Sequence, residues 1–287
     1  MIDLRSDTVT QPSQKMKQFM LNAPLGDDVY GDDPSIQALE KQAADIFKKE
    51  SSAFVPSGTM ANLISVLSHC DRGDEIILGN KSHIFVYEAG GISAFGGIHS
   101  HQLHNTDDGK ICLSGLENAV RNPNDSHHPI SKLICLENTH NLCFGAPIKE
   151  NYFNSVKEIA NQYNLKIHID GARIFNASVA LNTEVHHLTK HADSVSCCLS
   201  KGLSSPVGSL IIGTAKFISK AKRIRKALGG GMRQSGILAA AGIYSFNHMI
   251  DHLDTDHENA KLLAEELSKI DNIKIDLEKI HTNIIFF

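Results

Sequence analysis

The sequence predicts an α/β protein in which helices cover both faces of a mostly parallel central sheet. The first observation is an alternation of short apolar runs with helical segments from residue 52 to about residue 228. Strands separated by helices favour a parallel sheet. The second observation is that runs such as 133–137 and 194–199 are largely apolar along their length, as expected for strands buried between two helical layers.

Two segments precede the alternating region. Residues 5–12 are polar and predict an extended arm, which leads into a helix from about Gln14. Further on, Asp33 and Pro34 supply an N-cap and a first-turn proline for a helix that continues to Phe47.

The elements of the alternating region follow from their apolar periodicity. The expected strands are 53–55, 75–78, 98–104, 133–137, 166–170, 194–199 and 210–212. The expected helices are 59–67, a glycine-interrupted segment after 83, 113–120, 157–163 and 185–188. Ligands of such sheets bind beyond the carboxyl ends of the strands. The polar residues at these ends are therefore candidates for a site: Ser57, Glu137, Asp170 and Lys201.

The last part of the chain predicts helices followed by two short strands. The helices are expected at 215–228, 234–249 and 256–270, with three glycines at 229–231 between the first two. The apolar segments 273–275 and 283–287 are expected to be strands. We therefore predict a large domain over residues 1–250, which includes the N-terminal arm. Residues 251–287 are expected to begin a small C-terminal α+β domain that is cut short.

Charge and composition argue against several classes of partner. The formal net charge is −4, from 28 Lys+Arg and 32 Asp+Glu, so no overall field attracts nucleic acid or an anionic membrane. The six cysteines lack the spacing of a disulfide framework, which favours a reducing compartment. The start, Met1-Ile2-Asp3-Leu4-Arg5, has no apolar signal core, and no window approaches the roughly 18 apolar residues of a membrane span. A cytoplasmic protein without nucleic-acid or membrane partners is predicted.

Lys201 is the first candidate for a reactive group. It follows an apolar strand and lies between Ser200 and Gly202, so no bulky side chain next to it in the sequence crowds the amine. This is what a lysine that forms a Schiff base requires. A solvated lysine at the end of a strand is the alternative interpretation.

Three further motifs complement this lysine. Ser57-Gly58-Thr59, between a strand and a helix, can bind an anion with its backbone N–H groups or serve only as a helix cap. Asp170 can pair with a protonated pyridine nitrogen or form a structural ion pair with Arg173. His83 can stack on a flat ring or be structural. In this order the motifs are those of a fold-type I enzyme that uses pyridoxal 5′-phosphate.

Longer motifs extend the comparison to most of the chain. They are residues 5–10 (RSDTVT), 26–34 (GDDVYGDDP), 136–141 (LENTHN), 168–176 (HIDGARIFN), 199–203 (LSKGL) and 229–236 (GGGMRQSG). In these motifs the sequence closely resembles the low-specificity L-threonine aldolases of the β-eliminating lyase group. The resemblance implies a fold-type I architecture and a lyase that cleaves L-threonine or L-allo-threonine to glycine and acetaldehyde.

The resemblance also implies how the cofactor is bound. Lys201 would hold pyridoxal 5′-phosphate covalently, Asp170 would keep its ring nitrogen protonated, and His83 would stack on the ring. The remaining cofactor-binding positions are Ser57, Gly58, Thr59, Arg173 and Arg233. The basic helix over 215–228 is expected at a subunit interface near the phosphate.

A second set of residues is implied for the substrate and for assembly. Ser6 and Arg173 match groups that hold the substrate carboxylate. Tyr30 matches a tyrosine that reaches across a dimer interface, and Arg233 an arginine lent by a neighbouring subunit. A homo-oligomer, a dimer of dimers with shared active sites, is therefore implied. His127 is expected near the substrate hydroxyl as the base, assisted by His83, although the adjacent His128 is an alternative.

Other functions stay open at this point. Family members continue past residue 283 into a small domain that supplies another carboxylate-binding arginine, which this sequence does not contain. One alternative is another lyase or racemase that acts on amino acids with the same cofactor. A second is a shortened cofactor-binding subunit with little activity. No metal site is predicted, because His186, His187 and His191 lack an accompanying acid or cysteine pattern.

Overall fold

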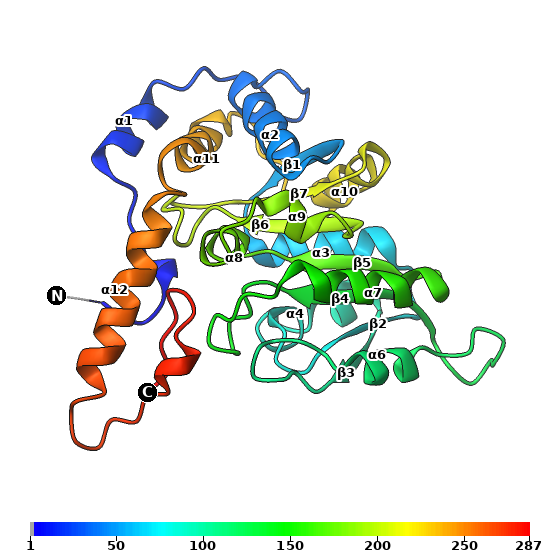
Figure 1. Ribbon diagram of the computed structural model, residues 1–287. Coiled ribbons are helices and arrows are strands. Elements are labelled where there is room, and N and C mark those ends of the chain that lie inside the picture. Colours follow the sequence, from blue (N-terminus) through cyan, green and yellow to red (C-terminus); the bar gives the residue numbers. More distant parts are fainter. Residues whose placement is uncertain (1–2) are drawn as a thin grey trace.

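The computed structural model describes residues 3–287 of the chain. Met1 and Ile2, the first residues of the segment inspected for a signal peptide, lie outside the described residues. The architecture is a seven-stranded sheet flanked by helices, which confirms the predicted α/β class (Figure 1). None of the helices within residues 3–287 is long and apolar enough to cross a membrane.

The sheet has the strand order β1-β7-β6-β5-β4-β2-β3. The strands are β1 (Ser51–Val55), β2 (Asp74–Gly79), β3 (His99–Leu103), β4 (Ile130–Glu137), β5 (Lys166–Asp170), β6 (Ser194–Cys198) and β7 (Ser209–Gly213). β7 runs antiparallel to both of its neighbours, and every other pair is parallel. The connection 199–208 has no room for a crossover helix, so β7 returns directly beside β6. The carboxyl ends of β1 to β6 therefore meet at one edge.

Helices cover both faces of this sheet. One face carries α3 (Gly58–His69) and α10 (Ala215–Ala227), and the other carries α2 (Pro34–Phe47), α6 (Leu113–Ala119), α7 (Glu150–Gln162) and α9 (Val185–Thr189). Along β2, Ile76 and Leu78 pack with α3, whereas Ile77 packs in the core on the opposite face. This alternation is the two-residue period of a strand that is buried on both sides.

The remaining helices complete the fold. They are η1 (Asp7–Val9), α1 (Gln14–Leu21), α4 (His83–Val86), α5 (Gly91–Gly96), α8 (Ile174–Ala180), α11 (Gly236–His248), α12 (His252–Leu267) and η2 (Leu277–Lys279). The predicted start of α2 is confirmed, because the Asp33 carboxylate accepts a hydrogen bond from the backbone N–H of Ile36 at 3.0 Å and Pro34 is the first helical residue.

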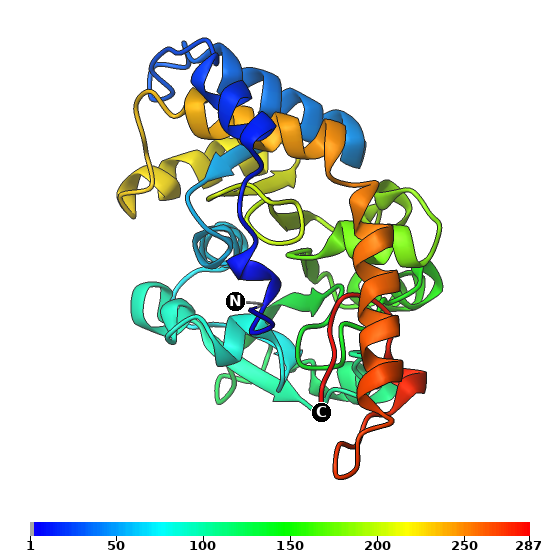
Figure 2. The ribbon, with the colours of Figure 1, turned by 90° about the vertical axis from the view of Figure 1, so that its left-hand side faces the viewer.

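The two strands predicted after α12 are wrong. Residues 273–275 and 283–287 form no strand, since neither segment has a partner ladder within residues 3–287. The end of the chain instead returns beside the N-terminal arm, as Figure 2 shows for the red and dark blue segments. Its contacts are made by side chains: Thr282 Oγ1 donates to the Gly145 carbonyl at 2.8 Å, and the Phe286 ring packs on Phe144. The predicted domain boundary at residue 250 stays a prediction.

Candidate active site

The strand order brings the predicted polar residues to one edge of the sheet. Ser57, His83, Glu137, Asp170 and Lys201 each lie at or just beyond the carboxyl end of β1, β2, β4, β5 and β6, respectively. Because these strands run in the same direction, their carboxyl ends line a single rim. The expected convergence of Ser57, Glu137, Asp170 and Lys201 at one rim is therefore confirmed, and the structure adds His83 to it.

Asp170 is a buried carboxylate at the centre of this rim, with 3% of its surface exposed. Its Oδ2 accepts a hydrogen bond from Asn62 Nδ2 at 2.8 Å, and its Oδ1 accepts one from the backbone N–H of Ala172 at 3.0 Å. Burial raises the pKa of Asp170, but the positive charges of His83 and Lys201 and the Asn62 hydrogen bond outweigh burial, so the pKa is lowered. The carboxylate is therefore ionised at neutral pH.

His83 is held in place through both its backbone and its ring. Its backbone N–H donates to Glu137 Oε2 at 2.8 Å, and its ring Nδ1 lies 2.8 Å from Glu88 Oε1. The hydrogen bond to Glu88 raises the pKa of His83 in spite of burial. The pKa of Glu88 is raised too, because its burial outweighs the hydrogen bonds that it accepts. Since Nδ1 is committed to Glu88, Nε2 is the ring atom that is free to exchange a proton.

The turn before α3 forms an anion cradle. Ser57 is the N-cap, and its hydroxyl accepts a hydrogen bond from the backbone N–H of Met60 at 3.2 Å. The backbone N–H groups of Gly58 and Thr59 lie in the first turn, where a helix offers no internal acceptor. A Cβ on Gly58 would lie 2.6 Å from Cys198 Sγ, so the end of β6 passes directly beneath the turn. Only glycine allows this approach.

Arg173 binds the N-terminal arm instead of Asp170. Its Nε and Nη2 donate to the two carboxylate oxygens of Asp7 at 2.7 Å each, and 7% of Arg173 is exposed. Asn283 also donates to Asp7, at 3.1 Å. Burial raises the pKa of Asp7, but the hydrogen bonds and charge of Arg173 outweigh burial, so the pKa is lowered. The Ser6 hydroxyl lies 3.5 Å from Asp7 Oδ1, the same oxygen that accepts from Arg173 Nη2.

Tyr30 and Arg233 form a separate, exposed group. Tyr30 is 78% exposed, and the Arg233 guanidinium carbon lies 5.7 Å from the centre of its ring. Arg233 also pairs with Asp27 at 3.0 Å. Within residues 3–287, no hydrogen bond or ion pair connects this pair to Asp170 or Lys201.

His127 lies at the opposite edge of the sheet. It precedes β4, whose eight residues put roughly 25 Å between its amino end and Glu137. The His127 side chain is 89% exposed, and its Nδ1 is 2.8 Å from Asp125 Oδ1. His128, the alternative, occupies the same loop and lies 3.6 Å from Asp125. Neither ring reaches the rim of its own chain, so a role at the substrate would require a second copy of the chain.

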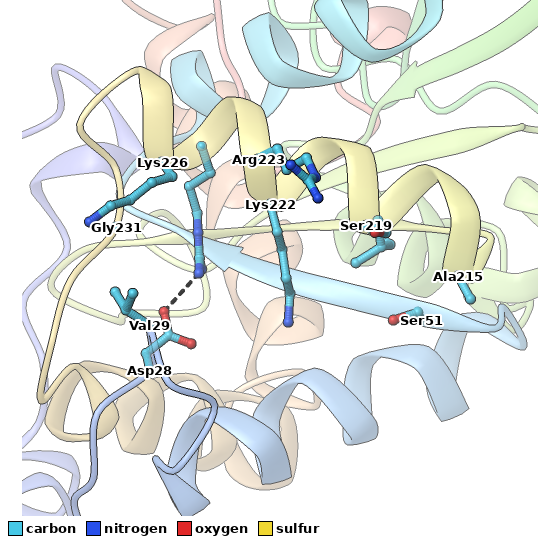
Figure 3. A pocket seen from close by; sticks show the side chains of 11 residues that line it. Asp28, Val29, Ser51, Ala215, Ser219, Lys222, Arg223, Lys226 and Gly231 are labelled. Atoms are coloured by element: carbon cyan, nitrogen blue, oxygen red, sulfur yellow. Dashed lines mark hydrogen bonds and ion pairs between the residues drawn. The ribbon is translucent and has the colours of Figure 1, made fainter.

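A cavity of about 550 Å³ lies along α10, away from the rim (Figure 3). Figure 3 shows Lys222 and Lys226 on the side of α10 that faces Asp28 and Val29. The helix over 215–228, which corresponds to α10, was predicted to be basic, but part of its positive charge is neutralised by carboxylates of the same chain. Lys222 pairs with Glu40 at 2.7 Å, and the buried Arg225 pairs with Asp28 at 2.8 Å.

Sequence reasoning missed Asn62 and Glu88. Asn62 Nδ2 donates to Glu88 Oε1 at 2.7 Å as well as to Asp170, and both residues are buried. A polar residue on the apolar face of α3, between Ala61 and Leu63, was the available signal. Among residues 3–287, His83, Glu88 and Asp170 also form the one group whose atoms lie close enough to hold a metal ion. These atoms are already hydrogen-bonded to one another or to Asn62.

Comparison with known proteins extends these findings. A model of the beta-eliminating lyase family matches residues 3–287. The chain is 52% identical over 287 residues to the probable low-specificity L-threonine aldolase 2 of Arabidopsis thaliana, covering 99% of this chain and 81% of that protein. It is 46% identical over 286 residues to the low specificity L-threonine aldolase of Escherichia coli (strain K12), covering 100% of this chain and 84% of that protein.

Solved structures with lower identity share the fold. A putative L-allo-threonine aldolase from Listeria monocytogenes superposes with a TM-score of 0.80 at 21% identity, covering 94% of this chain and 74% of that chain. The threonine aldolase of Leishmania major superposes with a TM-score of 0.81 at 18% identity, covering 94% of this chain and 80% of that chain.

Proposed function

This chain belongs to the beta-eliminating lyase family, and we propose that it cleaves the Cα–Cβ bond of L-threonine and L-allo-threonine to give glycine and acetaldehyde. The observation that carries the proposal is the 46–52% identity, over nearly the whole chain, to relatives named as low-specificity L-threonine aldolases. The rim formed by His83, Asp170 and Lys201 supports it, because it joins an ionised carboxylate, an imidazole and an amine.

The experiment that tests this function measures acetaldehyde release from L-threonine and L-allo-threonine, with serine as a third substrate. Aldol cleavage gives acetaldehyde and glycine in equal amounts from the first two substrates. Pyruvate and ammonia from serine would instead indicate β-elimination, and interconversion of enantiomers would indicate a racemase. A chain that releases none of these products contradicts the proposal.

We propose pyridoxal 5′-phosphate as the cofactor, because the residues of the rim fit it. The Gly58–Thr59 turn offers free backbone N–H groups for a phosphate, and a Cβ at Gly58 would have no space. Asp170 is buried and ionised, as a partner for a protonated ring nitrogen must be. Lys201 is the residue that would hold the cofactor covalently. When bound, the cofactor supplies an electron-withdrawing ring that accepts the electron pair of the cleaved bond.

The residues of this chain then have distinct tasks. Asp170 stabilises positive charge on the ring nitrogen, and so favours electron withdrawal in the transition state. Cleavage also requires removal of the proton on the substrate hydroxyl. His83 is the base that this chain offers, through Nε2, because Nδ1 is fixed by Glu88. The network around His83 therefore sets its orientation as well as its pKa.

Protonation of His83 predicts how activity depends on pH. As a base His83 must be neutral, and its pKa is raised by Glu88, so kcat/KM is expected to rise with pH through that raised pKa. Glu88→Gln removes the negative charge and lowers the pKa of His83. The acid limb of the kcat/KM profile is then expected to move to lower pH. Glu158→Gln, on the exposed face of α7, serves as the control and is expected to leave the limb in place. An unmoved limb in Glu88→Gln contradicts the assignment.

The substrate carboxylate is proposed to bind at Ser6 and Arg173. Nε and Nη2 of Arg173 are used by Asp7, which leaves the Nη1 end of the guanidinium for a second carboxylate. The Asp7 pair thus orients the arginine for the substrate. The arm is itself held by Asn283 from the end of the chain.

Arg173→Lys tests this carboxylate site. A lysine provides one ammonium and cannot bind two carboxylates with a planar fork. The KM for L-threonine is expected to rise roughly tenfold to a hundredfold with a smaller change in kcat, as for loss of charged hydrogen bonds. Arg72→Lys, at the exposed turn before β2, is the control and is expected to retain the wild-type KM. An unchanged KM in Arg173→Lys places the substrate carboxylate elsewhere.

We further propose a homo-oligomer with shared sites, in the cytoplasm. Tyr30 and Arg233 are exposed and paired with each other, as suits residues that complete the site of a neighbouring chain. A role for His127 has the same requirement. The cytoplasmic location is supported by six cysteines that are all free thiols.

A further inference from the structure

A chain of polar side chains is buried behind Asp170, inside the layer between β5, β6 and α3. Asn62, His168, Ser194 and Ser196 are each at most 2% exposed. Buried polar groups cost stability unless each of them finds a partner. None of the polar atoms of these four side chains lacks a partner within residues 3–287. The interior therefore holds a fully connected network where apolar residues would also fit.

The two carboxylates fix the orientation of the Asn62 amide. Its Nδ2 lies 2.7 Å from Glu88 Oε1 and 2.8 Å from Asp170 Oδ2. The ionised Asp170 carboxylate only accepts hydrogen bonds, and Glu88 Oε1 also lies 2.8 Å from the Nδ1 of His83, so both hydrogens of the amide are donated to these oxygens. The amide oxygen must then face the other way. There it accepts from Ser196 Oγ at 2.8 Å and from His168 Nε2 at 3.1 Å.

This orientation in turn fixes the protons of the buried His168 and of the partly buried His69. His168 must carry its proton on Nε2 in order to donate to Asn62. Burial lowers the pKa of His168 to about 4, so the ring is neutral and Nδ1 accepts from Ser194 Oγ at 2.9 Å. The Ser194 hydroxyl then accepts from His69 Nε2 at 2.8 Å. Every donor in the series points from His69 toward the two carboxylates.

From this geometry we propose that Asn62 and His168 are positioning residues for the reaction, in which His168 fixes the Asn62 amide and Asn62 holds Asp170 and Glu88 at once. The proposal rests on the proposed function, because Asp170 would pair with the ring nitrogen of the cofactor and Glu88 contacts His83, the proposed base. Without the His168 donor, the Asn62 oxygen keeps the hydrogen bond from Ser196 Oγ but loses the other hydrogen bond that orients it, so the amide is held less firmly against the carboxylates. The hydrogen bonds that Asn62 donates to both carboxylates, which favour their ionised form, then weaken.

The test compares His168→Leu with His168→Gln. Glutamine offers an amide N–H near the position of Nε2, whereas leucine fills space without a donor. In the chain without cofactor, the rate at which diethyl pyrocarbonate modifies His83 is followed against pH by peptide mass spectrometry, since only the neutral ring reacts. In His168→Leu, the midpoint of the curve of His83 modification rate against pH is expected to move to lower pH. The reason is that a less ionised Glu88 stabilises the charged form of His83 less. His168→Gln is expected to recover most of the wild-type midpoint.

Binding of pyridoxal 5′-phosphate gives a second, independent measurement. The Kd of His168→Leu is expected to rise roughly tenfold, the effect of one weakened hydrogen bond to a charged group. The Kd of His168→Gln is expected to stay close to that of the wild type. If the His168→Leu variant folds but keeps both the wild-type midpoint for His83 modification and the wild-type Kd for pyridoxal 5′-phosphate, the proposal is overturned. Equal losses in both variants also overturn it, because the ring would then act only by filling space.

Folding and the proposed function are checked separately. Thermal melting shows whether His168→Leu folds, and Ser194→Ala, which removes a single hydroxyl, replaces it if it does not. A smaller midpoint shift in the same direction is expected for Ser194→Ala, and an unmoved midpoint overturns the proposal. If the wild-type chain fails to bind pyridoxal 5′-phosphate, the proposed function fails, while the His83 midpoint in the cofactor-free chain still decides on the network.

Discussion

Lys201→Ala is expected to abolish cleavage of L-threonine, with a fall in kcat on the order of 10⁴-fold or more, as for loss of a covalent catalytic group. Lys201 follows β6 at the rim, and its charge lowers the pKa values of both Asp170 and Asp7. The amine is therefore within electrostatic reach of the proposed cofactor site and of the proposed carboxylate site. Turnover is measured by acetaldehyde release from chain supplied with pyridoxal 5′-phosphate.

A trapping experiment checks that the loss arises at this amine. Borohydride reduction of the wild-type chain with the cofactor is expected to label the peptide that contains Lys201, as seen by mass spectrometry. Lys216→Ala, on the exposed side of α10, is the matched control and is expected to retain turnover and labelling. A label on another lysine, or substantial turnover in Lys201→Ala, would remove Lys201 from this role.

Elements determined by local signals were predictable. The N-cap Asp33 and Pro34 specify the start of α2 within the helix itself, and the apolar run of β6 leads to Lys201 without reference to distant residues. The order of the sheet was not readable in the same way. That β7 would lie between β1 and β6, antiparallel to both, depends on pairing between residues far apart in the chain.

The C-terminal strands show the limit of apolar runs as evidence. Segments 273–275 and 283–287 have the composition of strands, but a strand forms only with a ladder partner. In the structure, Thr282 and Asn283 use their side chains to bind Gly145 and Asp7 instead. Composition alone does not reveal whether such a segment pairs its backbone with a strand or binds through its side chains.

The site was predictable in its motifs but not in its pairings. Asp170 and His83 were found because each occupies a recognisable place after a strand. The bond between Arg173 and Asp7 joins residues 166 positions apart, and sequence spacing contains no sign of it. His127 precedes β4 and so lies at its amino end, away from the rim of its own chain. Its predicted role depends on a neighbouring chain, which sequence spacing does not reveal. Motifs thus located the rim, and three-dimensional pairing determines what each group there can do.

Asp170→Asn is expected to lower kcat for L-threonine by roughly 10²- to 10³-fold, as for removal of a group that stabilises transition-state charge. An amide of the same shape keeps a hydrogen bond to Asn62 but carries no charge, so it cannot keep the ring nitrogen protonated. KM is expected to change less than kcat, because the proposed site for the substrate carboxylate is Arg173 and not Asp170. Steady-state kinetics with saturating pyridoxal 5′-phosphate separates the two parameters.

Asp193→Asn is the control that makes this result specific to charge at the rim. Asp193 also accepts two hydrogen bonds beside a strand, from Lys166 Nζ at 2.8 Å and from the backbone N–H of Ile167 at 3.0 Å, but it precedes β6 at the opposite edge of the sheet. Its loss is expected to lower the melting temperature and leave kcat unchanged. If Asp170→Asn and Asp193→Asn have equal effects on kcat, Asp170 acts through stability alone. If only Asp170→Asn slows turnover in a folded chain, the carboxylate acts on the reacting system, and the charges of His83 and Lys201 together with the hydrogen bond from Asn62 keep it ionised.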